Sequence, residues 1–336
     1  MNADQAIAEM VSPSQRRPGK WREGVMQIHL NRICDLACSN CTQGSQFGGK
    51  NAYMSLRNFE RACKSMKGYF GLIGIFGGNP ALHPHFAEVC QILRSHFPKE
   101  QCGIWCNHPH GKAHHMAITF NPSMSNLNVH LRQDAYDDFK DGWPDSAPFG
   151  LTQDSRHSPV HGALHHFVPH EDDRWNLIAN CDINRHWSAM LCQFRGELRG
   201  FFCEVAGGQA ILNQFNPDYP DTGMPICEFC NGTGRIEAYR GEPSQGTEMV
   251  ACDGCDGVAW WKRPMQAFGD QVKQHCVNCL VPLRGHGALA QQQHVTTITS
   301  EYAHLPIKNR HELVINDGGT SLHPETSRRV IDYLGK

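Results

Sequence analysis

The first third of the chain alternates between segments with the periodicity of strands and segments with the periodicity of helices. Residues 24–30 alternate apolar and polar side chains, as a half-buried strand does, and residues 56–66 carry apolar side chains at helical spacing behind the N-cap residue Ser55. The same patterns predict a buried strand at 69–76, a helix at 86–97, and strands at 102–106 and 127–131. Strands that alternate with helices predict an α/β fold with a parallel sheet, which keeps its chemistry at the carboxyl ends of the strands.

Composition places the chain among ordinary globular proteins. It has 336 residues, 40% hydrophobic and 19% charged, a length that suits two domains or one large α/β barrel with an appendage. The formal net charge of −2 gives no global basic field that would attract nucleic acid or a membrane. No apolar run has the length of a membrane-spanning helix. Residues 1–23 contain no hydrophobic stretch of signal-peptide length, so we expect a loose leader and a cytoplasmic protein.

Cysteine is the most informative residue type in the chain. There are sixteen cysteines, and in a reducing cytoplasm closely spaced cysteines are more often metal ligands than disulfides. Four pairs have C-x2-C spacing: Cys38/Cys41, Cys227/Cys230, Cys252/Cys255 and Cys276/Cys279. Cys63, Cys90 and Cys102 belong to predicted core elements, where we expect them to pack as small hydrophobic residues.

Three of these cysteines, Cys34, Cys38 and Cys41, form a C-x3-C-x2-C loop directly after the first predicted strand. A cubane iron–sulfur cluster usually takes four cysteines, so three leave one iron open to a ligand that is not protein. The spacing alone also allows a zinc ion with a distant fourth ligand, or three unrelated thiols. A GGNP turn at residues 77–80 follows the second strand, where glycines let the backbone approach a ligand closely.

This combination resembles the radical S-adenosylmethionine (SAM) superfamily, in which a GGEP-type turn follows the second strand. The resemblance implies a partial (β/α)6 barrel over residues 24–180, with a catalytic 4Fe-4S cluster on the three cysteines and SAM as its fourth ligand. It also implies that SAM is bound by Gly77, Gly78, Asn79, Pro80, Asn107 and His130. The sequence departs from the family at Asn40, where members usually have an aromatic residue that lies against adenine.

A second cysteine set resembles the auxiliary-cluster module of SPASM/Twitch radical SAM enzymes, over residues 181–220 and 260–300. A predicted hairpin with its turn at Glu197–Gly200 ends in cysteines, and a C-x2-C pair follows later. The resemblance implies an auxiliary 4Fe-4S cluster on Cys192, Cys203, Cys276 and Cys279, with Cys181 as an alternative or additional ligand. A metal ion that only staples the domain is the alternative.

Residues 221–259 have the spacing of an inserted zinc ribbon. Two C-x2-C pairs followed by glycines suit a tetrahedral site on Cys227, Cys230, Cys252 and Cys255. The C-x2-C-x-G-x-G run that begins at Cys227 locally resembles half a cysteine-rich repeat of J-domain chaperones. The competing partition pairs Cys227/Cys230 with the hairpin and Cys252/Cys255 with Cys276/Cys279. Trp260 and Trp261, next to Lys262 and Arg263, either clamp nucleic acid or pack the ribbon onto the barrel.

Two further segments carry weaker patterns. Residues 134–180 are polar and contain His157, His161, His165, His166 and His170, with no carboxylate or cysteine at a ligand-like register. We expect a solvated or substrate-covering loop there, in which His165 or His166 can handle protons near the barrel mouth. The tail at 301–336 has an amphipathic stretch at 327–334 that predicts a packed helix.

The resemblance implies an enzyme that cleaves SAM reductively to an adenosyl radical, which abstracts a substrate hydrogen in a biosynthetic or modification step. It implies an electron donor such as flavodoxin or ferredoxin, and we favour a small molecule or peptide as substrate. One alternative is a radical SAM enzyme that modifies a tRNA or DNA base and grips nucleic acid through the zinc ribbon. Another is a non-catalytic zinc-binding interaction protein. Fold and cluster do not determine the substrate or the reaction subclass.

Overall fold

The structure is a computed structural model that describes residues 1–16, 24–38, 41–47, 53–152, 160–181, 188–239, 247–286, 296–302, 305 and 313–315. Its centre is a six-stranded sheet in the order β3-β2-β1-β4-β5-β6. The strands are β1 (Val25–Asn31), β2 (Leu72–Gly77), β3 (Cys102–Ile104), β4 (Ala189–Phe194), β5 (Glu197–Phe201) and β6 (Met224–Pro225). The pairs from β3 to β4 are parallel and those from β4 to β6 are antiparallel, so the sheet is mostly parallel as predicted.

The sheet continues beyond β3 through short parallel contacts. Trp105 bridges Asn126, and Asn128 bridges Phe149, so two more segments lie beside the edge strand in the same direction. The predicted strand at 127–131 is therefore a run of bridges rather than a regular strand. Within the described residues, no pairing closes the sheet into a barrel.

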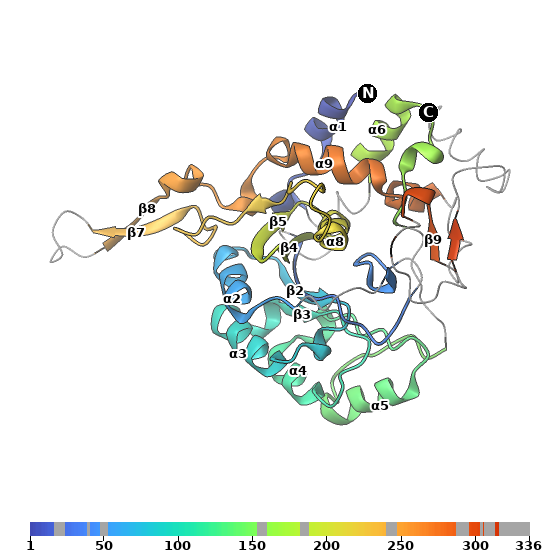
Figure 1. Cartoon of the computed structure of the whole chain (residues 1–336). Coiled ribbons are helices and arrows are strands. Elements are labelled where there is room, and N and C mark those ends of the chain that lie inside the picture. The colour runs from blue at the N-terminus through green and yellow to red at the C-terminus, as the bar shows by residue number, and fades with distance from the viewer. Residues whose placement is uncertain are drawn as a thin grey trace.

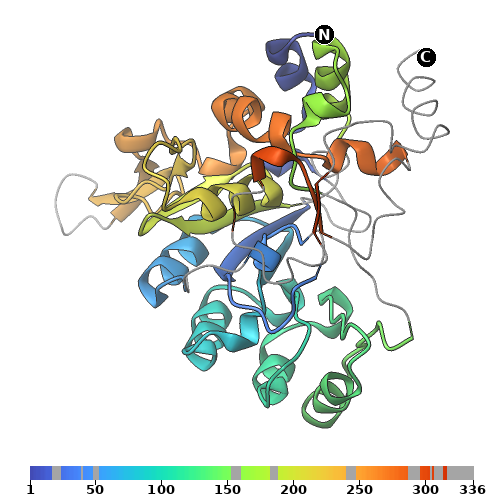
Figure 2. The same cartoon turned by 45° about the vertical axis from the view of Figure 1, so that its right-hand side comes forward.

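Helices cover the parallel part of the sheet, whose strands β1 and β2 are buried along their whole length, as strands covered on both faces are. Figure 2 shows α2 (Leu56–Ser65), α3 (Phe86–His96), α4 (Ala113–Thr119) and α5 (Gln133–Gly142) along one side of β1–β3. The Ser55 side chain accepts a hydrogen bond from the Asn58 amide, which confirms the predicted N-cap. None of the helices in the described ranges is long and apolar enough to cross a membrane.

The N-terminal segment is packed rather than loose, which corrects the expectation for residues 1–16. Helix α1 (Ala3–Glu9) begins with a capping box between Asn2 and Gln5, and its Ala6 and Ile7 are buried. It lies against α6 (Glu171–Ala179) and α9 (Gly269–His275) at the top of Figure 1. Residues 17–23 lie outside the described part, so the rest of the predicted leader is untested.

The prediction of a loop over residues 134–180 is also wrong in the part of that segment that the structure describes. The helices α5 and α6 occupy much of it, and they bury Phe139, Trp175 and Ile178. Apolar residues here are few but stand three or four positions apart, which suffices for a helix that buries one narrow face. Because most residues of the segment are polar, this helical spacing of the few apolar residues was not recognised in the sequence.

The predicted hairpin exists, but its turn is shifted. Strands β4 and β5 are joined by Arg195 and Gly196, both with positive φ (49° and 89°), instead of turning at Glu197–Gly200. Two residues with positive φ give the tight turn that matches strand twist. Helix α8 (Glu204–Asn213) follows β5 directly and packs on both hairpin strands.

The predicted ribbon leaves the body of the protein after β6. Strands β7 (Arg235–Tyr239) and β8 (Thr247–Ala251) form an antiparallel pair that extends away from the other elements (Figure 1). Trp260 and Trp261 are buried at its base, and the Trp261 indole donates to the Ser65 carbonyl at 3.2 Å. The packing role of the two tryptophans is therefore confirmed. A separate parallel pair, β9 (Thr296–Ile298) and β10 (Leu313–Ile315), lies in the C-terminal part.

Three buried histidines should make stability depend on pH. Burial lowers the pKa of His29 to about 3, of His161 to about 4 and of His275 to about 3. The unfolded chain takes up protons near pH 6.5 and the native state does not, so stability is complete above that pH and falls as pH drops toward the native values. Each histidine should cost about 2 kcal/mol between pH 7 and pH 5, measured by urea unfolding.

A His29→Met variant provides the control for this prediction. It removes one of these titrating groups and places an apolar side chain of similar volume in β1. The loss of stability between pH 7 and pH 5 should then shrink by about 2 kcal/mol. An unchanged pH slope in the variant would show that buried neutral histidines do not set the acid limit.

Candidate functional site

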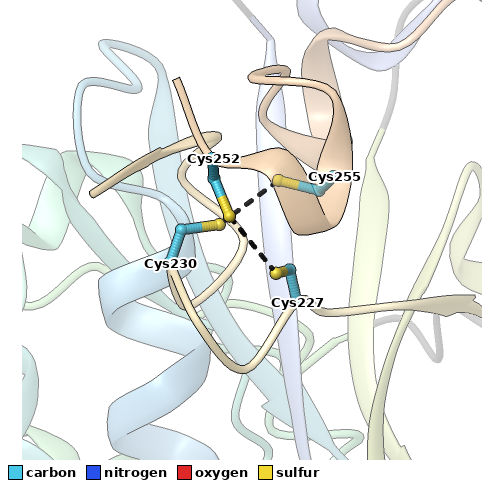
Figure 3. Close-up of side chains that lie close together, drawn as sticks. All are labelled: Cys227, Cys230, Cys252 and Cys255. Atoms are coloured by element: carbon cyan, nitrogen blue, oxygen red, sulfur yellow. Dashed lines mark hydrogen bonds between the residues drawn. The ribbon is translucent and has the colours of Figure 1, made fainter. Parts of the chain in front are cut away.

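The ribbon brings four cysteines together at its base. Each C-x2-C pair sits on a similar turn, with Asn231 and Gly232 after the first pair and Asp256 and Gly257 after the second, all at positive φ. In both turns the glycine amide donates to the carbonyl of the first cysteine, at 3.0 Å. As a result, the side chains at the base of the β7–β8 pair point toward one another, one C-x2-C pair before β7 and the other after β8: Cys227, Cys230, Cys252 and Cys255 (Figure 3).

The spacing of these sulfurs fits a single metal ion. The Sγ atoms of Cys227 and Cys252 are 3.8 Å apart and those of Cys230 and Cys255 are 3.4 Å apart. Tetrahedral zinc with about 2.3 Å bonds spaces its sulfurs about 3.8 Å apart, whereas a cubane binds each cysteine at a different iron. Burial would raise the pKa of Cys230, but hydrogen bonds from Cys255 and the Gly234 amide outweigh it and lower this pKa to about 7. The four ribbon cysteines therefore lie together as the nested partition requires, and they are not divided between two sites as in the competing partition.

Removing one of these thiols tests the site. Cys230→Ser should reduce the metal bound at this site from about one atom per chain to near zero, because three thiolates and a hydroxyl bind far more weakly. Metal analysis by a chromogenic chelator measures the loss. Cys90→Ala, in a buried cysteine of α3, is the control and should keep its metal. Full metal retention in Cys230→Ser would contradict the assignment.

A second cysteine group lines a mostly apolar pocket between α8, α9 and the end of α6. The four cysteines in its wall are Cys181, Cys203, Cys276 and Cys279, and the other lining residues include Ile178, Phe202, Val205 and His275. Burial raises the pKa of Cys203 to about 12 and also raises the pKa of Cys276 well above its usual range. These two thiols are therefore protonated at neutral pH.

Cys192 does not line this pocket. It lies in the middle of β4, opposite Arg199 of β5, and cross-strand partners share one face of a sheet. Arg199 and Asp221 form an ion pair at 3.0 Å. After burial, these two charges have the largest effect on the pKa of Cys192. The shifted hairpin turn explains the difference, because Cys192 becomes a strand residue instead of the end of a hairpin. The sequence pattern, in contrast, favours Cys192 over Cys181 as a ligand.

A buried arginine lies beside the pocket. Arg16 is 1% exposed and donates from its Nη1 to the Phe202 carbonyl at 2.5 Å. Burial lowers its pKa to about 10, and the nearby cysteines Cys203 and Cys181 act in the opposite direction. Arg16 is therefore a cation at neutral pH, and a cation here favours the thiolate over the thiol. Arg16 lies within residues 1–23, for which the sequence predicts a loose leader, so its burial was not expected.

The Cys34–Cys41 loop starts at the carboxyl end of β1 and rests against the turn after β2. The Gly78 amide donates to the Asn31 carbonyl at 2.7 Å and the Asn79 amide to the Ile33 carbonyl at 2.6 Å. A Cβ on Gly77 would lie 2.3 Å from the Asn31 oxygen, and one on Gly78 would lie 2.2 Å from the Ile33 oxygen. The two glycines thus let the loop and the turn approach closely.

Asp35 is the centre of a polar network around this loop. It forms an ion pair with Arg132, accepts from Asn107 Nδ2 at 3.2 Å, and lies 3.4 Å from His110 Nε2. Burial would raise the pKa of Asp35, but the bonds from Arg132 and Asn107 lower it to about 2. Asp35 thus ties the cysteine loop to the segments after β3 and beyond. Nothing in its sequence context identified it.

Two of the predicted SAM ligands contact the cysteines directly. Asn107 Nδ2 lies 3.7 Å from Cys34 Sγ, and His130 Nδ1 lies 3.9 Å from Cys38 Sγ. The Oδ1 atom of Asn107 is buried and has no hydrogen-bond partner in the described structure. Asn79 differs, because its side chain accepts from the Ala81 amide and donates to the His108 carbonyl. Its backbone is engaged as well, because the amide donates to the Ile33 carbonyl and the carbonyl accepts from Asn31 Nδ2 at 3.1 Å. Pro80 begins the short helix that the Asn79 side chain caps.

His161 connects the two cysteine loops. Its Nε2 donates to the Cys41 carbonyl at 2.8 Å, while its backbone bridges Cys279 and the Gly162 amide donates to the Asn278 carbonyl. The side chain is 1% exposed, which contradicts its placement in a solvated loop. Buried and neutral, His161 fixes the position of one loop relative to the other.

Comparison with known proteins adds no assignment. No family model matches the chain, and no curated protein sequence matches it. The geometry establishes a mixed α/β protein with a four-cysteine group able to hold a metal.

Proposed function

We propose that this protein is a radical SAM enzyme with a partial barrel, an auxiliary iron–sulfur cluster and a structural zinc ribbon. The observation that carries the proposal is the position of the cysteine triplet. Cys34, Cys38 and Cys41 follow β1 at the carboxyl edge of a parallel sheet, against the Gly77–Gly78 turn after β2. Parallel α/β folds keep their chemistry at this edge.

The residues around the triplet suit the groups that the proposal requires. Cys34, Cys38 and Cys41 would hold the catalytic cluster, and bound SAM would supply the adenosyl radical that removes a hydrogen atom from the substrate. Asn107 offers the unpartnered Oδ1 as an acceptor for a donor on SAM, while Asp35 fixes the Asn107 amide. His130 beside Cys38 offers a second polar contact.

For the auxiliary cluster we propose the ligands Cys181, Cys203, Cys276 and Cys279. They share one apolar pocket, and the buried cation Arg16 offsets the negative charge that four thiolates bring. His161 holds the Cys279 loop against the Cys41 loop, so a group bound in either is positioned relative to the other. An electron donor such as flavodoxin or ferredoxin, and a small-molecule or peptide substrate, belong to the same proposal.

The charge of the ribbon argues against the nucleic-acid alternative. Residues 221–259 contain seven aspartates and glutamates but only two arginines, and four zinc-bound thiolates add further negative charge. A grip on phosphates requires a basic surface. The two tryptophans at the base are buried and cannot stack on bases.

Metal analysis after anaerobic reconstitution tests the proposal against the non-catalytic alternative. We expect about eight iron atoms and about one zinc per chain. About four iron atoms per chain, together with more than one zinc, would show that the protein has no auxiliary iron–sulfur cluster. Absence of iron after reconstitution would leave only the zinc-binding interaction protein.

A further inference from the structure

His165, His166 and Glu301 meet on the surface from distant parts of the chain. His166 Nε2 lies 2.7 Å from Glu301 Oε1, and His165 Nε2 lies 3.8 Å from the same oxygen. No carboxylate stands at a ligand-like register with these histidines in the sequence of residues 134–180. The fold supplies one from 135 residues away.

The backbone beneath the three side chains is fixed. The histidines end a short helix, η6 (Leu164–His166), and Glu301 is in the middle of another, η14 (Ser300–Tyr302). The buried Ala163 amide donates to the buried Thr299 Oγ1 at 3.0 Å, directly below the pair. The Tyr302 hydroxyl donates to the Asn278 carbonyl, which joins the same segment to the cysteine pocket.

This convergence is selective. The chain has 21 histidines and 33 aspartates and glutamates, yet in the described ranges only the ribbon cysteines and this trio gather their ligand atoms within 4.8 Å. The adjacent pair His114 and His115 shows that neighbouring histidines alone are not enough. The ring centroids of His114 and His115 are 3.9 Å apart. Besides His114, the charged side chain that affects the pKa of His115 is Lys112, which is a cation and not a metal-binding carboxylate.

We propose that His165, His166 and Glu301 bind a divalent transition-metal ion that fastens the 299–302 segment to η6. Two imidazoles and one carboxylate suit Zn2+, Co2+ or Ni2+, and they leave a fourth position for water. Bonds of about 2.0–2.2 Å require ligand atoms roughly 3–3.5 Å apart, which the two contacts to Glu301 bracket. The site is independent of the proposed radical chemistry.

Cobalt titration of the full chain tests the site, after its cysteines are filled with iron and zinc. Co2+ should bind with about one additional equivalent and give a d–d absorption spectrum without a sulfur-to-cobalt charge-transfer band. Glu301→Gln and His166→Ala should each weaken this binding at least about tenfold, while His115→Ala leaves it unchanged. All three side chains that form the site are partly exposed, so these variants should fold.

Amide hydrogen exchange measures directly whether the bound metal holds residues 299–302 against η6. Adding Zn2+ should slow exchange in residues 299–302 of the parent chain and of His115→Ala, but not of Glu301→Gln. A charge-transfer band, no additional equivalent, or binding that Glu301→Gln and His166→Ala leave unchanged would each overturn the proposal.

Discussion

Cys38→Ala is expected to abolish reductive cleavage of SAM by the reconstituted protein. Cys38 is the central cysteine of the triplet and lies 3.9 Å from His130. Removing it leaves two thiolates in the loop, too few to hold a cubane whose fourth iron must stay open for SAM. We expect the iron content to fall by about four atoms per chain, with zinc unchanged.

Cys63→Ala is the matched control for this experiment. Cys63 is equally a cysteine of the N-terminal half, but it is buried in α2 as part of the hydrophobic core. Its loss should cost about 1 kcal/mol of stability and change neither iron nor SAM cleavage. If Cys38→Ala cleaves SAM at the parent rate, the triplet does not hold the catalytic cluster.

A second pair of variants distinguishes the two possible sets of auxiliary-cluster ligands, one with Cys181 and the other with Cys192. Cys181→Ala should lower the iron content by about four atoms per chain, while Cys192→Ala should keep it at the parent level. The reason is position, because Cys181 lines the pocket with Cys203, Cys276 and Cys279, and Cys192 shares a strand face with Arg199. Zinc should remain in both variants.

The pair forms its own control, since both positions are buried cysteines. Electron paramagnetic resonance of the reduced proteins should show the catalytic signal in both and the auxiliary signal only in Cys192→Ala. The reverse pattern would restore the ligand set that the sequence motif favours and refute the one that the fold favours.

Local patterns predicted the elements whose signals are local. The strands at β1 and β2 and the helix behind Ser55 follow from periodicity and capping within a few residues. The ribbon site was predictable for the same reason, because each C-x2-C pair forms its own turn and a hairpin joins them.

Features that depend on register or on distant contacts were not predictable. The position of Cys192 outside the cysteine pocket depends on the turn at Arg195–Gly196, which differs from the predicted turn at 197–200 and places Cys192 within β4. Arg16 meets the Phe202 carbonyl across 186 residues, and Glu301 meets His166 across 135. No spacing in the sequence encodes either contact. The predicted helix at 327–334 and the residue Asn40 lie outside the described residues and stay untested.

The central claim is that the triplet supports radical chemistry on SAM, and the product formed from SAM tests it most directly. The anaerobically reconstituted full chain, reduced with dithionite and given SAM, should release 5′-deoxyadenosine and methionine. Its Cys38→Ala variant should release neither. If the reduced parent protein carries its full iron and leaves SAM intact, or converts it only to S-adenosylhomocysteine without 5′-deoxyadenosine, the account is contradicted.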